Sequence, residues 1–395
     1  MKVNALDIVL LLVAAIYALS GYQQGFVVGS ASTVGLLLGG FLGAQITPLL
    51  LEGFDPGLSV SLAALLIVLA LAFIGQSAGA FAGGQLRRRI TWQPARTVDA
   101  LSGAALSVVA MLLIAWVLGV AASGTQLPRL NQVIRSSVVL GSVDDAIPGG
   151  TSRILSTFNS LVDSSKFPRY LEPFAPERIK DVPAPSPEVV QSADIREAGR
   201  SVVKVVGSAD DCGRTLEGTG FAFGRSTVMT NAHVVAGVDN PVVIVGDNSY
   251  RSEVVHYDPD VDVAVLRVPR LDLPSLRFAT TPAVSEDSAA VLGFPENGPY
   301  DVQPARVRDQ QTLRSPDIYS EGTVSRDAYS IHARVRQGNS GGPLVNFEGE
   351  VLGVIFAASV TSPNTGYALT ADQVSGAAAQ GRAALTEVST GSCTL

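Results

Sequence analysis

Three short motifs in the second half of the sequence could together perform nucleophilic catalysis. The motif Thr-Asn-Ala-His ends at His233, Asp-Val-Asp-Val-Ala contains Asp262, and Gly-Asn-Ser-Gly-Gly contains Ser340. A serine hydroxyl is a weak nucleophile at neutral pH and needs a neighbouring base, for which histidine is suited. A carboxylate can hold that imidazole in one tautomer and stabilise its protonated form. The sequence therefore predicts a catalytic triad of His233, Asp262 and Ser340.

The glycines around Ser340 indicate a site for a negatively charged reaction intermediate. Gly338 and Ser340 would each direct a backbone N–H at the oxygen of a tetrahedral intermediate. Glycine is suited to such a loop because it adopts backbone angles that other residues avoid. We therefore expect Gly338 and Ser340 to form an oxyanion hole. A domain that keeps these residues but has lost activity is the alternative.

The segments that must position these motifs read as short strands. From about residue 202, runs of Val, Ile and Phe alternate with Gly, Pro, Asn and Asp, and no helix longer than about two turns is expected before Asp372. Short strands with frequent turns are typical of a β-barrel or a β-sandwich. The strands predicted most clearly are residues 201–206, 220–223, 242–245, 263–268, 289–292 and 350–356.

The order His, Asp, Ser resembles that of the chymotrypsin clan, and the flanking residues resemble the HtrA branch of bacterial proteases. The resemblance implies an all-β, chymotrypsin-like double β-barrel over residues 191–395. It also favours Asp262 over the alternative Asp260, because Asp-x-Ala-Val-Leu matches the family's strand. Asn339 stands where trypsin-like zymogens carry an acidic residue, so activation by a freed N-terminus is not expected. Arg334 stands where relatives place the base of the specificity pocket, and it either favours an acidic substrate side chain or points to solvent.

The first part of the chain has the composition of a membrane segment. Hydrophobic residues make up 47% of the 395 residues and charged residues 16%, and the apolar excess lies mainly before residue 123. The apolar stretches are residues 8–19, 26–51, 58–81 and 101–122. The last three have the roughly 20 residues that a membrane span needs, whereas the first is shorter. We predict an all-α transmembrane bundle of four helices over residues 1–122, in contact with membrane lipid.

Glycines recur at four-residue spacing in two of these stretches, at positions 35, 39 and 43 and at positions 75, 79 and 83. In lipid, this spacing lets helix backbones approach each other closely. We therefore expect the helices to pack together. A second hypothesis gives the glycine-lined bundle a channel or transport function, with the barrel as its sensor. Against that hypothesis, the spans contain almost no ionisable residues to mark a pathway.

Charge predicts the orientation of the bundle. The connection between the third and fourth stretches carries arginines at positions 87, 88, 89 and 96, and basic loops remain cytoplasmic. The catalytic domain then lies in the periplasm, attached to the inner membrane by a multi-pass segment. Four spans place the N-terminus outside as well. If the first stretch does not span, the N-terminus moves inside and the catalytic domain stays outside.

The opening of the chain resembles the colicin V production family of membrane proteins. An early acidic residue, Asp7, precedes an apolar run that ends in Gly21-Tyr-x-x-Gly25-Phe26. The resemblance covers about residues 1–165. Residues 123–190 are expected to form an extracytoplasmic connection, with helices at 131–139 and 152–162 on either side of Pro148-Gly-Gly. An extended linker with three alternating prolines follows at residues 181–188.

The two cysteines, Cys212 and Cys393, are too few for a zinc cluster, so we expect neither a metal nor a cofactor. In an oxidising compartment they are predicted to form a disulfide, and two unpaired buried thiols are the alternative. The net charge of −7 argues against nucleic acid as a partner.

A colicin V production-like bundle followed by an HtrA-like domain resembles the acid-resistance family of periplasmic serine proteases of mycobacteria. The resemblance implies a serine endopeptidase that acts on polypeptide substrates in the cell envelope, peptidoglycan hydrolases among them. It also implies a role in acid and oxidative stress and in cell-wall maintenance.

Overall fold

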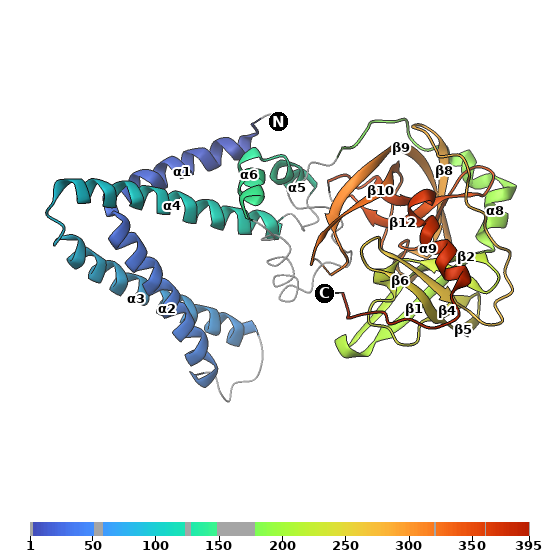
Figure 1. Cartoon of the computed structure of the whole chain (residues 1–395), viewed down its shortest axis with the longest axis horizontal. Helices are drawn as coiled ribbons and strands as arrows, with labels where there is room; N and C mark the ends of the chain where they lie inside the picture. Colours follow the sequence, from blue (N-terminus) through green and yellow to red (C-terminus); the bar gives the residue numbers. More distant parts are fainter. Residues whose placement is uncertain are drawn as a thin grey trace. The chain divides into compact units, whose positions relative to one another are not determined.

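The computed structural model describes residues 3–50, 58–122, 128–147, 178–319, 321–359 and 361–394. Two compact units are present, one of Met1–Leu118 with Ser137–Val143, the other of Gly119–Ser136 with Asp144–Leu395. The helices before the catalytic half are α1 (Ala5–Gln24), α2 (Phe26–Leu50), α3 (Leu58–Arg87), α4 (Gln93–Ala122), α5 (Pro128–Arg135) and α6 (Val138–Ala146) (Figure 1).

The first four helices are the predicted membrane segments. In the described part of the chain, α1 to α4 are long and apolar enough to cross a membrane. The sequence underestimated α1, which begins at Ala5 because Asn4 and Asp7 form a reciprocal cap. The Asp7 N–H donates to the Asn4 side chain at 3.0 Å, and the Asn4 N–H donates to the Asp7 carboxylate at 2.9 Å. These bonds satisfy N–H groups that a helix otherwise leaves without partners.

The glycine spacing in α2 and α3 brings their backbones into contact, as predicted. A Cβ atom added at Gly35 would lie 2.1 Å from the carbonyl oxygen of Gly75, and one added at Gly79 would lie 2.2 Å from that of Ala31. Both distances are too short for any side chain larger than hydrogen. The two helices consequently lie side by side along their length (Figure 1). Close packing of the two helices therefore requires these glycines.

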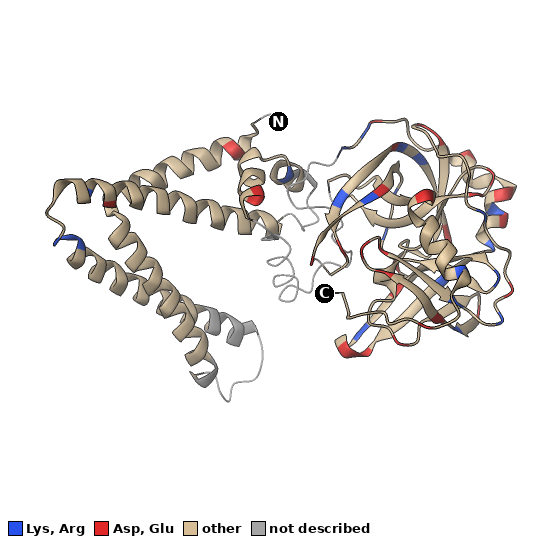
Figure 2. Cartoon of the chain, viewed as in Figure 1, with Lys and Arg blue, Asp and Glu red and all other residues tan. Residues whose placement is uncertain are grey.

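The turn between α1 and α2 explains the Gly-x-x-x-Gly-Phe pattern. The Asp99 carboxylate accepts the Val27 N–H at 2.9 Å and the Arg87 Nε–H at 2.7 Å. A Cβ atom at Gly25 would lie 2.0 Å from that carboxylate, and Gly25 has a φ of +78°. The ion pair of Arg87 with Asp99 thus joins α3 to α4 at the basic end of α3 (Figure 2). The hydrogen bond from Val27 joins the start of α2 to the same carboxylate.

The segment predicted as one helix over residues 131–139 is two helices, so that prediction was wrong. Ser137 interrupts it, because its hydroxyl accepts the Leu140 N–H at 3.2 Å and caps the start of α6. The same hydroxyl and the N–H groups of Val138 and Val139 donate to the carboxylate of the fully buried Asp7. The helix predicted at 152–162, with its preceding Pro-Gly-Gly, lies outside the described residues.

The second half of the chain contains the two curled antiparallel sheets of the predicted fold. One sheet has the order β5-β4-β1-β2-β3-β7-β6, and the other closes into a barrel in the order β10-β13-β12-β11-β8-β9. The strands are β1 (Val202–Ala209), β2 (Arg214–Gly224), β3 (Thr227–Thr230), β4 (Val242–Val245), β5 (Asn248–Arg251), β6 (Glu253–Asp258), β7 (Val263–Arg267), β8 (Ser288–Gly293), β9 (Asp301–Pro316), β10 (Thr323–His332), β11 (Pro343–Val345), β12 (Val351–Ala358) and β13 (Thr365–Thr370).

Only Ser252 separates the two end strands of the first sheet, β5 and β6, so the chain itself joins its edges. Each sheet encloses its own apolar cluster, and a third cluster contains residues of both sheets and of α9 (Ala371–Ala383). Each of the six predicted strands lies within or overlaps an observed one. The long β9–β10 hairpin carries many polar residues and was not among them.

The proline-rich segment, predicted as an extended linker, packs against the second barrel. Val182 and Val189 are buried, and Val189 belongs to the cluster shared by the two sheets. The buried guanidinium of Arg308 on β9 donates to the carbonyl oxygen of Lys180 at 2.7 Å. Two short helices, η1 (Pro187–Gln191) and α8 (Ala193–Gly199), then lead into β1.

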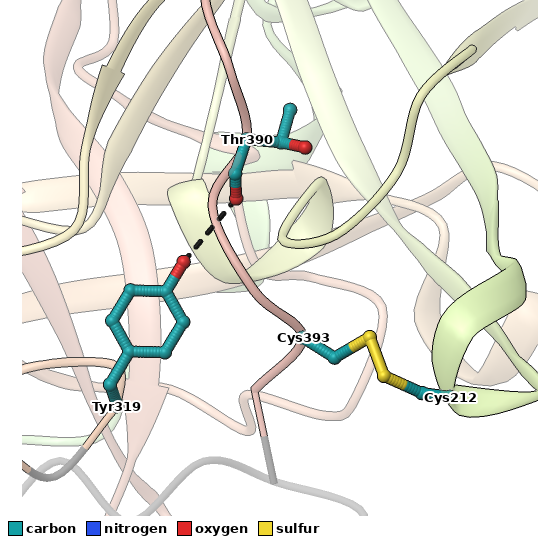
Figure 3. Close-up of a disulfide and its surroundings, with 4 residues drawn as sticks. All are labelled: Cys212, Tyr319, Thr390 and Cys393. Atoms are coloured by element: carbon teal, nitrogen blue, oxygen red, sulfur yellow. Dashed lines mark hydrogen bonds between the residues drawn. A yellow bond between two sulfur atoms is a disulfide. The ribbon is translucent and has the colours of Figure 1, made fainter.

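The C-terminal tail crosses the first sheet and ends in the predicted disulfide, Cys212–Cys393, with Cα atoms 6.5 Å apart. On the way, the Thr390 carbonyl oxygen accepts the Gly237 N–H at 3.2 Å and the Tyr319 hydroxyl at 3.3 Å (Figure 3). The tail is thereby bonded to the segment that follows His233.

Candidate active site

His233 lies on a buried one-turn helix, η3 (Ala232–Val234), directly after β3. Its Nδ1 is 2.8 Å from one carboxylate oxygen of Asp262 and 3.0 Å from the other, and its backbone N–H donates to the same carboxylate at 3.0 Å. The Asp262 side chain is fully buried. Because a carboxylate only accepts hydrogen bonds, Nδ1 carries the proton and Nε2 is the basic nitrogen.

Asp262 adopts an unusual backbone conformation that its neighbours hold in place. Its φ is +71°, in the left-handed region that residues with side chains seldom adopt. Its N–H donates to the Asp258 carbonyl oxygen at 3.0 Å, and its own carbonyl oxygen accepts the Asn231 side-chain amide at 2.7 Å. Asp260, the alternative acidic residue, is exposed. The structure thus brings Asp262 to His233.

Ser340 lies in a loop that is pressed against the first sheet. The Ser340 carbonyl oxygen accepts the Thr219 N–H at 2.8 Å. A Cβ atom at the next residue, Gly341, would lie 2.1 Å from the Thr219 carbonyl oxygen and 2.3 Å from the hydroxyl of Thr230. Thr230 is three residues before His233 and donates to Thr219 at 2.7 Å. The loop of the serine and the segment of the histidine therefore share the same partners.

The peptide bond between Gln337 and Gly338 is fixed by a loop that the sequence did not point to. The Gln337 carbonyl oxygen accepts the Glu296 N–H at 2.7 Å, and the Gly338 carbonyl oxygen accepts the Thr219 hydroxyl at 2.6 Å. In a trans peptide the C=O and N–H groups point in opposite directions. The Gly338 N–H therefore points away from Glu296. In the described part of the chain, the N–H groups of Gly338 and Ser340 donate to no other protein group.

Asn339 holds this loop from inside. It is buried, its side-chain oxygen accepts the Arg336 N–H at 2.9 Å, and its own N–H donates to the Arg336 carbonyl oxygen at 3.0 Å. Arg336 in turn forms ion pairs with Asp301 and, at 3.7 Å, with Glu296. The position at which zymogens carry an acidic residue thus serves an internal turn. No signal in the sequence indicated the roles of Arg336 and Glu296, because Asp301, Glu296 and Gln337 pair across 35 to 41 residues of sequence.

Arg334 is exposed, which agrees with the alternative that its side chain points to solvent. The next residue, Val335, is buried instead. A Cβ atom on Gly366 of β13 would lie 2.2 Å from a methyl group of Val335, so Val335 occupies the space beside that strand.

A partly buried pair of tyrosines lies near Asp262. The hydroxyl groups of Tyr257 and Tyr319 are 2.7 Å apart, and Tyr257 packs near Ala232 and Ala236, on either side of His233. Burial and the hydrogen bond that Tyr257 donates to Tyr319 raise the pKa of Tyr257, with a further contribution from the charge of Asp262. Tyr257 is therefore harder to ionise than a free tyrosine.

The two halves of the chain match two known families. Residues 218–354 match the model of the trypsin-like peptidase domain, and residues 6–148 match that of the colicin V production protein. The chain is 39% identical to the serine protease Rv3671c of Mycobacterium tuberculosis H37Rv over 390 residues, which cover 98% of each protein. It is 32% identical over 140 residues to a probable DegP-like periplasmic serine endoprotease of Halomonas elongata, covering 35% of this chain and 28% of that protein.

Among solved structures, the active form of the Rv3671c protease from M. tuberculosis is similar, with 45% identity and a TM-score of 0.54. The match covers 57% of this chain and 99% of that one. The similarity of sequence extends over both halves, and that of structure over the catalytic half. The chain therefore belongs to the Rv3671c family of HtrA-like serine proteases, with a trypsin-like peptidase domain attached to a colicin V production-like helical segment.

Proposed function

We propose that this protease cleaves polypeptides of the cell envelope with Ser340 as nucleophile. His233 Nε2 takes the hydroxyl proton as Ser340 Oγ attacks the peptide carbonyl carbon. The carbonyl oxygen becomes an oxyanion that accepts hydrogen bonds from the N–H groups of Gly338 and Ser340. His233 then gives its proton to the leaving amine as the C–N bond breaks, and an acyl-enzyme forms. A water molecule, deprotonated by His233, releases the acid in the reverse sequence.

The contact between His233 and Asp262 carries the proposal. A fully buried carboxylate accepts both the ring N–H and the backbone N–H of one histidine. Burial of an ionised carboxylate is costly unless donors compensate it. A pair that orients an imidazole and stabilises its protonated form fits the role of a general base.

The decisive experiment uses the full-length chain in detergent and a fluorophosphonate probe, which reacts only with an activated serine. We expect the wild type to be labelled and Ser340→Ala to lose labelling and peptide hydrolysis, the latter by a factor on the order of 10⁶. Ser201→Ala is the matched control, because Ser201 is equally buried but donates to the Pro274 carbonyl oxygen, away from the site. Labelling that persists in Ser340→Ala would refute the assignment.

We further infer that the catalytic half lies in the periplasm. The basic residues between α3 and α4 support a cytoplasmic loop at that point. Alkaline phosphatase, which is active only outside the cytoplasm, tests this orientation. Fusion after residue 394 should be active and fusion after residue 90 inactive; the reverse pattern would place the protease in the cytoplasm.

The proposed substrates are envelope proteins, including peptidoglycan hydrolases, and the proposed setting is acid and oxidative stress with cell-wall maintenance. The resemblance to mycobacterial periplasmic proteases supports this part. Comparison of new N-termini in the envelope fraction of cells that carry wild type or Ser340→Ala, with and without acid stress, would identify the substrates. Fragments shared by both strains would not be products of this enzyme.

A further inference from the structure

A fully buried arginine in the second barrel donates hydrogen bonds to the turn before Asp262, which belongs to the first sheet. Arg326 is on β10 and has no exposed surface. Its Nε–H donates to the carbonyl oxygens of Asp260 at 2.8 Å and Val261 at 3.1 Å. At its other side, Nη1 donates to the Pro316 carbonyl oxygen at 3.0 Å and to the Ser315 hydroxyl. Asp260 and Val261 are the two residues directly before Asp262.

Hydrogen bonds within residues 258–262 satisfy the N–H groups of this turn, and Arg326 on β10 supplies donors for two of its carbonyl groups. The Asp258 side chain accepts the N–H groups of Asp260 and Val261 at 3.0 and 2.9 Å. The Asp258 carbonyl oxygen accepts the Asp262 N–H. These bonds fix the N–H side of the turn, and Arg326 fixes its carbonyl side.

The turn needs such support because Asp262 has a strained backbone. Asp262 has a φ of +71°, and a residue with a side chain persists in this conformation only where its surroundings hold it. If the carbonyl groups of residues 260 and 261 lost their donor, the turn could relax. The Asp262 carboxylate would then move relative to the His233 ring.

We propose that Arg326 is a positioning residue: it holds the turn at residues 260–261 so that Asp262 meets His233. The inference rests on the proposed triad. It means that the second barrel, which carries Ser340, also sets the position of Asp262 in the first. Arginine suits the task because its planar guanidinium binds several oxygens at fixed angles, whereas the ammonium of lysine is a single point charge.

The test compares phosphonylation kinetics of full-length variants, since the probe requires no knowledge of the substrate. In Arg326→Met we expect the maximal labelling rate to fall about 10- to 100-fold, as for a small displacement of a catalytic group. The probe concentration for half-maximal rate should stay within about twofold, because Arg326 touches no reacting atom. The final extent of labelling should equal that of the wild type. Arg326→Lys should fall between the two.

Arg308→Met is the matched control. Arg308 is also a buried arginine of the second barrel that donates to a backbone carbonyl oxygen, that of Lys180, but it does not contact the turn. We expect this variant to lose stability and to keep the wild-type labelling rate. Millimolar guanidinium should speed labelling of Arg326→Ala and have no such effect on Arg308→Ala.

Several results would overturn the inference. Arg326→Met could label at the wild-type rate, both arginine variants could slow alike, or a reduced final extent could account for the whole loss. If Arg326→Met does not fold, two other measurements test the inference. A wild-type labelling rate in Arg326→Lys, or no effect of guanidinium on Arg326→Ala, would overturn it. Failure of the triad itself is separate: labelling would then persist in Ser340→Ala, whatever the arginine variants do.

Discussion

At the scale of single residues, the backbone conformation of Asp262 determines that its carboxylate, and not that of a neighbouring aspartate, contacts His233. The left-handed conformation turns its carboxylate back towards the N–H and the ring of His233, so one side chain satisfies both. Asp260, two residues earlier, has the same chemistry and faces solvent. The turn therefore decides which carboxylate joins the site.

Asp262→Asn is expected to lower the maximal labelling rate by about 10⁴-fold, because an amide can stabilise the wrong tautomer of His233 and does not stabilise its protonated form. Phosphonylation of the folded variant measures the effect. Asp260→Asn should keep the wild-type rate. A comparable loss in both variants would contradict the assignment of the acidic residue.

A second residue-scale prediction concerns His256 on β6. Burial lowers its pKa, and the charge of Asp258 acts weakly in the opposite direction. The unfolded chain, with a histidine pKa near 6.5, then binds more protons than the folded one, so stability falls as the pH drops below about 6.5. His256→Gln should show a smaller decrease in melting temperature between about pH 7 and pH 5 than the wild type. An unchanged decrease would show that His256 does not contribute.

At the scale of elements, the contact between α2 and α3 depends on the absence of side chains at a few positions. Gly79 and Gly84 lie on the same helix, yet a Cβ atom would meet the Ala31 backbone at Gly79 and open space at Gly84. Helix association in lipid relies on such close packing because lipid tails are as apolar as the side chains.

Gly79→Val should therefore separate α2 from α3 and lower the unfolding midpoint in detergent, whereas Gly84→Val should leave it near the wild-type value. Both variants place the same side chain in α3, so the effect of valine on helix propensity is the same in the two variants. Equal midpoints for the two variants would refute the close contact.

Patterns that repeat within a segment were predictable from the sequence, and contacts between distant segments were not. Apolar length predicted the long apolar helices, and glycine spacing predicted the close helix packing. Residue types predicted His233 and Asp262 as partners, which the structure brings together, and Ser340 as the proposed nucleophile. The break at Ser137 was missed because its cause is Asp7, 130 residues earlier. The bond from Glu296 to Gln337 and those from Arg326 to residues 260–261 were missed for the same reason. Each of these hydrogen bonds joins residues that are distant in sequence and come together only in the folded chain.

At the scale of the whole molecule, a membrane unit and a protease unit are joined in one chain, and a disulfide ties the end of the protease to its beginning. The pairing links residues 181 apart in sequence. A cross-link of this length restricts the unfolded chain, for which the chain-entropy model gives about 4–5 kcal/mol, although measured values are often smaller.

Cys212→Ser should accordingly lower the melting temperature of the protease unit, as measured by calorimetry without reductant. Cys393→Ser and the double variant should show the same decrease, since each removes the same bond. A double variant much less stable than either single variant would mean that the cysteines contribute separately.

The pairing of Cys212 with Cys393 also makes the protease domain a covalent ring that encloses His233, Asp262 and Ser340. A single cut anywhere in the ring leaves the two pieces attached. A single cleavage within the ring, by this protease or by another, would therefore release no fragment, and the intact mass would grow only by one water molecule. Electrophoresis without reductant would miss such cuts, and paired lanes with and without reductant would reveal them.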